Sequence, residues 1–423
     1  MDDIAILAII WISVFFASWL AHLSRLTPPL WYLLVGALLV NLGVLPEEMP
    51  TFIEDLSKLG IIIIMFALGF EENTGNFLGS IKRSWGIALF GALAPFGIAY
   101  SVALFFWEDP RIALLCGLAM TATAVSITMV SLKSDGLHKT EAATGIMTSA
   151  VLDDIASLAL VALLVPIATG AAALSVDGLL LILGKVVAFF AIVTFLGGWL
   201  FPSQSKYLGH LPILNRINLR AVLAMGKGKY TILSLLLTAV LVGLLAHMFG
   251  FHPAIGAYMA GLIIRREYFD FHSDRDTDFH GQAREIIDNV AYSWIGPVFF
   301  VALGSKLVFD PAIFTAIIAP SLLLFAGLFI GQIVSAGLAA RYTGNFDGPS
   351  SLLIGLGMLG RAELAFVVME IAYVQHRIMS TEAFYALMVA AFLLNVSVPL
   401  TLRWWKLRYG QQLRQQSPGE SPT

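Results

Sequence analysis

Thirteen apolar segments run through this chain of 423 residues, and they constrain its fold more than any other feature. A helix that crosses a bilayer needs about 20 mostly apolar residues. The segments lie near residues 4–23, 29–45, 53–70, 84–107, 111–132, 142–168, 178–201, 230–250, 253–265, 287–305, 311–340, 348–374 and 382–403. The stretches between them are too short to fold as separate soluble domains. The pattern therefore predicts an all-α polytopic membrane protein with about 13 transmembrane helices.

The composition agrees with this class. Hydrophobic residues make up 58% of the chain and charged residues only 13%, whereas about 25% of the residues of an average soluble domain are charged. This composition excludes a soluble enzyme, and we expect no cofactor. Because the sequence has no basic stripe, we expect no nucleic-acid partner either. The single cysteine, Cys116, excludes an internal disulfide. Met1, Asp2 and Asp3 lack the positive charge that opens a cleavable signal, so the first segment is expected to be retained.

Basic residues are distributed unequally between the two sides of the membrane. If the N-terminus lies outside, 19 of the 25 Lys and Arg residues fall on the cytoplasmic side, and three, Arg111, Lys306 and Arg377, fall outside. Cytoplasmic loops usually carry such an excess. We therefore expect the N-terminus outside and the C-terminus in the cytoplasm. Residues 404–423 form a short cytoplasmic tail in this interpretation, and its polar end from Gln411 onward is expected to be disordered.

The sixth segment carries two adjacent carboxylates, Asp153 and Asp154, near its middle. An Asp at the centre of a membrane helix costs about 2.5–3.5 kcal/mol on insertion scales. Both side chains are therefore expected to face a hydrated interior rather than lipid. A structural pair capped by hydroxyls is the alternative, but carboxylate oxygens also bind hard cations and carry protons. The pair therefore indicates an ion- and proton-binding site.

Polar and small residues interrupt two further segments. The fifth contains the hydroxyls of Thr121, Thr123, Ser126 and Thr128, and the twelfth contains Gly355, Gly357 and Gly360 directly before Arg361 and Glu363. Both patterns predict discontinuous helices whose free backbone groups meet a polar centre, although the small residues of the fifth segment also suit close helix packing. A first repeat near 4–168, a linker helix near 178–201 and a second repeat near 230–403 make the two segments equivalent. This pairing predicts two inverted six-helix repeats with a transport site near the bilayer midplane.

These motifs resemble the monovalent cation:proton antiporters, and most closely the second branch of that superfamily, which includes prokaryotic sodium/proton antiporters. The likeness runs through nearly the whole chain, and its most specific part is the aspartate pair beside a hydroxyl-rich broken helix. The matching runs are residues 65–71 (MFALGFE), 123–128 (TAVSIT), 151–154 (VLDD), 253–261 (PAIGAYMAG), 297–304 (PVFFVALG) and 357–363 (GMLGRAE).

The resemblance implies a homodimer that exchanges a monovalent cation for protons by alternating access. Sodium is the expected cation, with potassium and lithium as alternatives. Asp154 would bind the cation or the proton, Asp153 would be its partner, and Thr123 would lie at the unwound crossing. Arg361 and Glu363 would form a structural or gating ion pair at the cytoplasmic side of the twelfth helix. The membrane would be a bacterial inner membrane or a thylakoid-type membrane.

The eleventh segment departs from the family pattern. Family members with two aspartates usually carry a lysine there that pairs with the first aspartate, and Gln332 occupies the matching position. Glutamine can donate a hydrogen bond but carries no charge. The sequence therefore predicts two carboxylates that compete for protons without that counter-ion, and it leaves electrogenic and electroneutral exchange both open. Ser126 and Thr128 complete the expected supporting residues.

Other functions are weaker alternatives. A sodium-coupled symporter of an organic anion could share the architecture, but of the residues in the spans only Arg361 suggests an anion-binding group. An intramembrane protease needs its two aspartates on separate helices, whereas Asp153 and Asp154 are adjacent. The loop at 272–280 resembles a calcium loop without its glycine and closing glutamate, so metal binding or pH sensing there is a minor alternative to a solvated loop.

Overall fold

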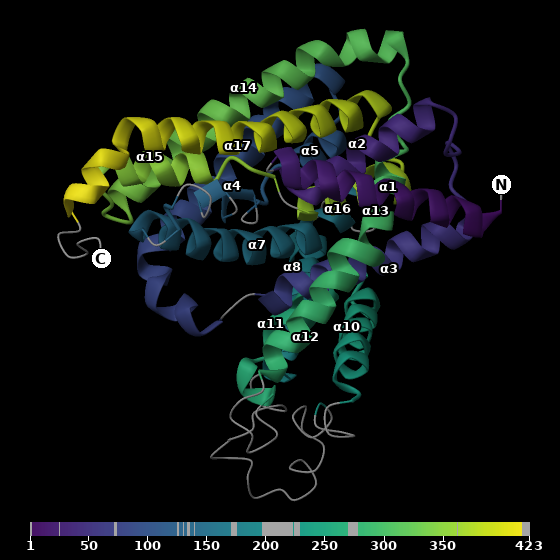
Figure 1. The fold of residues 1–423 in the computed structure, drawn as a ribbon, viewed down its shortest axis with the longest axis horizontal. Helices are drawn as coiled ribbons and strands as arrows, with labels where there is room; N and C mark the ends of the chain where they lie inside the picture. Colours follow the sequence, from purple (N-terminus) through teal and green to yellow (C-terminus); the bar gives the residue numbers. More distant parts are fainter. Residues whose placement is uncertain are drawn as a thin grey trace, which may run out of the picture. The chain divides into compact units, whose positions relative to one another are not determined.

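A computed structural model gives the fold (Figure 1), and it describes residues 2–24, 26–71, 74–124, 127–129, 131–132, 136–138, 140–170, 176–196, 223, 229–269, 278–361 and 363–416. Within these residues the regular structure is helical, and the β-type pairing found there is one isolated bridge. The predicted all-α class is confirmed. Ser126 and most of the loop at 272–280 lie outside the described residues.

Every predicted segment contains at least one α-helix. In chain order the helices are α1 (Asp3–Ser24), α2 (Pro28–Asn41), α3 (Thr51–Glu71), α4 (Thr74–Trp107), α5 (Pro110–Ala119), α7 (Glu141–Ala168), α8 (Val176–Phe195), α10 (Thr231–Met248), α11 (Pro253–Ile263), α12 (Phe279–Asn289), α13 (Gly296–Gly304), α14 (Pro311–Tyr342), α15 (Gly348–Gly357), α16 (Glu363–Glu370) and α17 (Thr381–Gln416). Short π-helices follow α12 at Val290–Trp294 and α16 at Ile371–Gln375.

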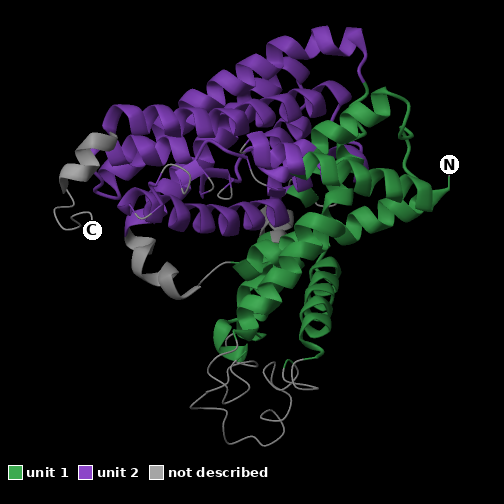
Figure 2. Cartoon of the chain, in the orientation of Figure 1, with its two compact units in different colours: residues 1–18, 32–76, 165–308 green, residues 19–31, 77–164, 309–423 purple. Residues whose placement is uncertain are grey.

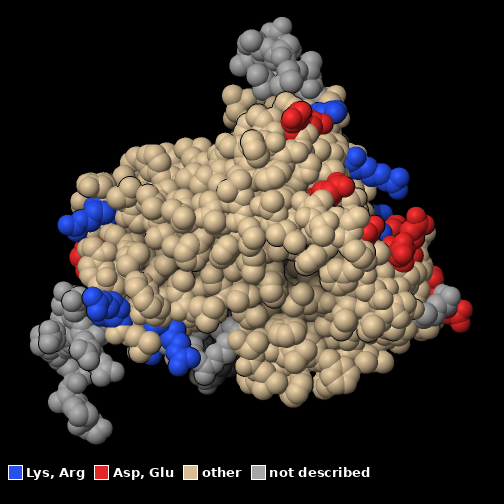
Figure 3. All heavy atoms as spheres, turned by 90° about the horizontal axis from the view of Figure 1, so that it is seen from above, with Lys and Arg blue, Asp and Glu red and all other residues tan. Residues whose placement is uncertain are grey.

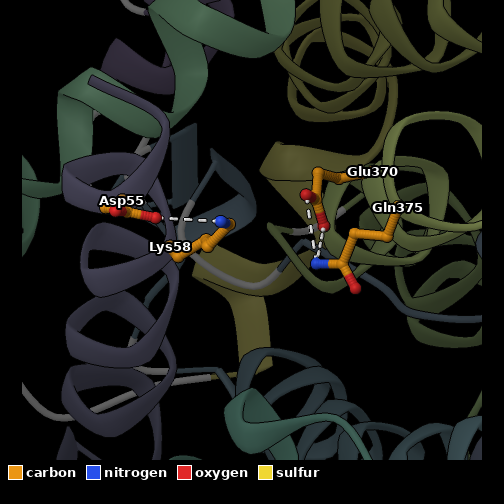
Figure 4. A network of polar contacts seen from close by, with 4 residues as sticks. All are labelled: Asp55, Lys58, Glu370 and Gln375. Atoms are coloured by element: carbon orange, nitrogen blue, oxygen red, sulfur yellow. Dashed lines mark hydrogen bonds and ion pairs between the residues drawn. The ribbon is translucent and has the colours of Figure 1, made fainter. Parts of the chain in front are cut away.

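Seven stretches of the described chain are long and apolar enough to cross a membrane, and several shorter apolar helices accompany them. The α3 helix has polar residues in its first two turns, where Lys58 Nζ donates to Asp55 Oδ1 at 2.9 Å on an exposed surface (Figure 4). Most of the surface visible in Figure 3 is uncharged, and its Lys, Arg, Asp and Glu residues gather in small groups near the margins of the view. The chain is therefore a multi-pass membrane protein.

The chain divides into two compact units (Figure 2), and the first comprises residues 1–18, 32–76 and 165–308. In this unit α3 packs against α11 and α13, and α10 packs against α11. Two glycines allow α3 and α11 to approach closely, because a side chain at Gly69 would overlap the backbone of Tyr258 and one at Gly261 would overlap the backbone of Phe66. Small residues commonly permit such packing between membrane helices.

The second unit comprises residues 19–31, 77–164 and 309–423. Here α14 packs against α15 and α17, while α5 packs against α16 and α17. Trp405, a fully buried residue of α17, donates from Nε1 to the carbonyl of Pro349 in α15 at 2.9 Å. Both elements that the sequence predicts to be broken, and the helix with the aspartate pair, belong to this unit.

Three of the predicted segments differ from the helices of the structure, either in where the helix ends or in its continuity. The second segment forms a helix to Asn41 rather than to residue 45, and the tenth is divided by the π-helix at Val290–Trp294. The largest difference is in α17, which continues to Gln416 although disorder was expected from Gln411. Gln and Arg have good helix propensities, and cations near a helix C-terminus interact favourably with its dipole. These properties account for the extension of α17.

Candidate ion-binding site

The first broken helix begins with a well-defined cap and ends early. Asp109 accepts a hydrogen bond from the backbone N–H of Arg111 at 2.8 Å, and Pro110 occupies the first helical turn. The side-chain hydrogen bond from Arg111 lowers the pKa of the Asp109 carboxyl, and this effect is larger than the opposite effect of partial burial, which raises the pKa. Helix α5 stops at Ala119, and residues 121–124 are not helical although they lie in the middle of an apolar segment. The predicted interruption of the fifth segment is confirmed.

The second broken helix is interrupted at its glycines. Helix α15 ends at Gly357, residues 358–361 are non-helical, and α16 begins at Glu363. A Cβ on Gly360 would lie 3.0 Å from Ala124 Cβ and 3.1 Å from Asn395 Oδ1. These distances are tighter than most real Cβ contacts, so a side chain at this position would require its neighbours to shift, and a glycine avoids that shift. The predicted interruption of the twelfth segment is confirmed too.

The two interruptions meet each other. Thr123 and Arg361 form an antiparallel β-bridge, and the N–H of Ala124 donates to the carbonyl of Gly360 at 3.0 Å. The hydroxyl of Thr128 donates to the carbonyl of Gly357 at 2.7 Å. Backbone groups that leave a helix inside a membrane must find other partners. We call residues 121–124 and 358–361 the crossing, because each segment supplies hydrogen-bond partners to the other.

The aspartate pair of α7 lies beside the crossing. Thr123 Oγ1 donates to Asp153 Oδ2 at 2.7 Å, and the Asp153 side chain is fully buried. Its Oδ1 atom has no hydrogen-bond partner within the described residues, so this oxygen is available as a ligand. Asp154 is half-buried and follows one helical residue later, about 100° around the α7 axis. The two carboxylates therefore have different surroundings.

Arg361 places a positive charge in the crossing. Its side chain is 1% exposed, its Nη2 donates to Gln332 Oε1 of α14 at 3.0 Å, and its Nη1 donates to the carbonyl of Gly360 at 3.4 Å. The guanidinium and the Asp153 carboxylate also attract each other electrostatically. A buried charge is tolerated when it is paired and hydrogen-bonded. Thr123 provides the hydrogen bond for the Asp153 carboxylate, and Gln332 and the Gly360 carbonyl accept those of the Arg361 guanidinium.

The structure places Arg361 in the crossing, where its side chain contacts Gln332. The expected ion pair of Arg361 with Glu363 at the cytoplasmic side of the twelfth helix stays a prediction. Glu363 is the buried first residue of α16. Gln332 stands where the family resemblance implies a lysine, and the Arg361 guanidinium of the broken helix donates a hydrogen bond to it.

Two residues outside the crossing, Thr128 and Asn395, support it through hydrogen bonds. The Thr128 hydroxyl donates to the backbone carbonyls of Ala124 and Gly357, which supports the crossing. Asn395 of α17, which sequence reasoning missed, makes two hydrogen bonds with the backbone of Arg361. A single amide in the apolar thirteenth segment was the signal that could have pointed to it.

Two broken helices that cross beside intramembrane carboxylates define a class of membrane protein, the secondary transporters. The chain belongs to the sodium/hydrogen exchanger family, whose transmembrane model matches residues 11–406. The predicted class, a cation:proton antiporter, is therefore confirmed, and the organic-anion symporter is not favoured. In the part of the chain that the structure describes, no group of three His, Cys, Asp or Glu side chains is arranged to hold a metal ion.

Individual relatives agree with this assignment. The chain is 26% identical over 375 residues to the Na(+)/H(+)-K(+) antiporter GerN of Bacillus cereus, covering 88% of this chain and 89% of the relative. It is 23% identical to the Na(+)/H(+) antiporter of Enterococcus hirae, covering 96% and 98% of the two chains. Its fold is similar to that of the sodium proton antiporter MjNhaP1 from Methanocaldococcus jannaschii, with a TM-score of 0.67, 13% identity, and coverage of 96% of this chain and all of the other.

Proposed function

We propose that the chain exchanges a monovalent cation, with sodium as the first candidate, for protons at the Asp153–Asp154 pair. One observation carries this proposal: at the crossing of the two broken helices, Thr123 donates to the buried Asp153 at 2.7 Å, which places the aspartate pair beside non-helical backbone inside an apolar segment. The relatives named for Na(+)/H(+) antiport support sodium. Potassium and lithium can bind the same kind of oxygen ligands.

Competition at Asp154 couples the two fluxes. A carboxylate that holds a proton cannot bind a cation at the same time, so loading one expels the other. An uncompensated carboxylate is costly in a membrane interior. The loaded site therefore crosses between its inward- and outward-facing states far more readily than the empty site. In this mechanism Asp153 and Arg361 keep their charges, and Asp154 is the residue whose occupant changes.

The rival symporter requires a group that binds an organic anion. Arg361 was the candidate for that group, but its guanidinium is buried, bonded to Gln332 and to the Gly360 carbonyl, and attracted to Asp153. An anion would have to displace these contacts. The geometry therefore favours an exchanger of cations and protons.

The setting of the exchanger is part of the proposal. The charge distribution along the sequence supports an outside N-terminus and a cytoplasmic C-terminus in a bacterial inner membrane or a thylakoid-type membrane. The family resemblance supports a homodimer. Exchange needs no bound cofactor, because the cation and the proton are themselves the substrates.

The test is exchange by purified protein in liposomes that hold an imposed proton gradient. Added sodium should dissipate the gradient in the wild type and have no effect in Asp154→Asn, which removes the exchangeable charge but keeps nearly the same shape. Asp55→Asn is the matched control, because it makes the same chemical change at an exposed aspartate. We expect the control to transport like the wild type. Robust transport by Asp154→Asn would refute the assignment.

A further inference from the structure

Asn395 is an amide buried in the middle of an apolar helix. It lies in α17, is 1% exposed, and follows a run of apolar residues from Ala386 to Leu394. A buried amide in an apolar environment is costly unless its donor and acceptor both find partners. Those partners identify what the residue does.

Both partners of Asn395 are backbone groups of the same residue. The N–H of Arg361 donates to Asn395 Oδ1 at 2.8 Å, and Asn395 Nδ2 donates to the carbonyl of Arg361 at 3.2 Å. The side-chain amide thus presents to Arg361 the donor and acceptor that a neighbouring β-strand would present. On its other side, this stretch pairs with the fifth segment through the Thr123–Arg361 bridge. The backbone at Arg361 is therefore held between two hydrogen-bonding partners.

The same residue is also fixed through its side chain. Gln332 of α14 accepts a hydrogen bond from the guanidinium, and α14 packs against α17. Two helices in contact thus hold Arg361, one through its backbone and the other through its charged group. Neither Asn395 nor Gln332 carries a charge, so their contribution to the site is positional.

We infer that Asn395 is a positioning residue for ion binding. It fixes the backbone of the crossing, and so holds the charge of Arg361 beside Thr123, which pairs with Arg361 through its backbone and donates to Asp153 through its hydroxyl. Without the amide, two buried backbone groups at Arg361 lose their partners, and the segment shifts to find others. The compensation of Asp153 then weakens, and with it the binding of a cation at the aspartate pair. This inference rests on the proposed function, because it assigns the pair as the binding site.

Asn395→Leu tests the inference, since leucine has a similar size and lacks both hydrogen-bonding groups. In the liposome assay we expect the apparent KM for sodium to rise about tenfold, with a smaller change in kcat, because the site is displaced but not removed. A general loss of folded protein would instead lower the rate without changing KM. Ser397→Ala is the matched control, because this hydroxyl of the same helix donates to the local carbonyl of Leu394.

If Asn395→Leu does not reach the membrane, Asn395→Gln takes its place. The longer side chain keeps the donor and acceptor but moves them by one methylene, so we expect a smaller rise in KM. An unchanged KM in either folded variant would overturn the inference. Asp154→Asn is measured beside them: transport by that variant contradicts the proposed function, whereas its inactivity together with a wild-type KM in Asn395→Leu contradicts only the role of Asn395.

Discussion

At the scale of single residues, the charges around the site determine how many ions move in each cycle. In the proposed mechanism Asp153 and Arg361 keep their charges throughout the exchange cycle. Gln332 cannot titrate. In the same mechanism Asp154 would be neutralised by one proton in one direction and by one monovalent cation in the other. The loaded site then has the same net charge in both directions, which corresponds to electroneutral exchange of one ion for one proton.

This arrangement predicts that wild-type exchange does not depend on membrane voltage. The initial rate is measured in liposomes at zero, inside-negative and inside-positive potentials, set by a gradient of a permeant anion so that no added cation competes. We expect equal rates. In Gln332→Lys the moving site carries an additional positive charge, so its rate should depend on the potential. A wild-type rate that changes with the sign of the potential would contradict the one-for-one mechanism.

At the scale of helices, the crossing depends on how closely α15 approaches α14. A Cβ on Gly355 would lie 2.6 Å from the backbone carbonyl oxygen of Ile333 in α14. Because a backbone atom cannot swing aside, the two helices would have to separate. Gln332, the residue before Ile333, binds Arg361, so this separation would also disturb the site.

We therefore predict that Gly355→Ala destabilises the protein by about 1–3 kcal/mol, the usual cost of overpacking. Gly348→Ala is the matched control, because it lies in the same helix with open space where its Cβ would be. Thermal unfolding in detergent should show a lower Tm for Gly355→Ala and an unchanged or slightly higher Tm for the control. Equal Tm values for the two variants would show that close packing of α14 and α15 is not required.

The sequence predicted the breaks in the two helices but not the side chains that hold Arg361. The breaks were predictable, because the glycines before Arg361 and the hydroxyls around Thr123 weaken a membrane helix locally. The partners of Arg361 were not, since Gln332 and Asn395 reach it only through the rotation of α14 and α17 about their axes, which hydropathy does not fix. The π-helix at Ile371–Gln375 was not predictable either, although it brings Gln375 Nε2 within 2.9 Å of the buried Glu370 carboxylate (Figure 4).

At the scale of the whole molecule, the orientation in the membrane depends on the number of spans. Removing or adding one helix would move every later loop to the other side and abolish the excess of basic residues on one side. The structure has an α-helix in each of the thirteen segments, and seven stretches of the described chain are long and apolar enough to span a membrane. The outside N-terminus stays a prediction, and exposed residues of the loops allow a direct test.

We predict that residue 48 is accessible from outside the cell and that residue 408 is accessible only from the cytoplasm. Cys116 is fully buried, so Cys116→Ala gives a background without cysteine in which single cysteines replace Glu48 or Arg408, both exposed. A membrane-impermeant maleimide should label Glu48→Cys in intact cells and Arg408→Cys only after permeabilisation. The background variant should stay unlabelled and active. The reverse labelling pattern would contradict the proposed orientation, because the basic residues would then face outward against the usual rule.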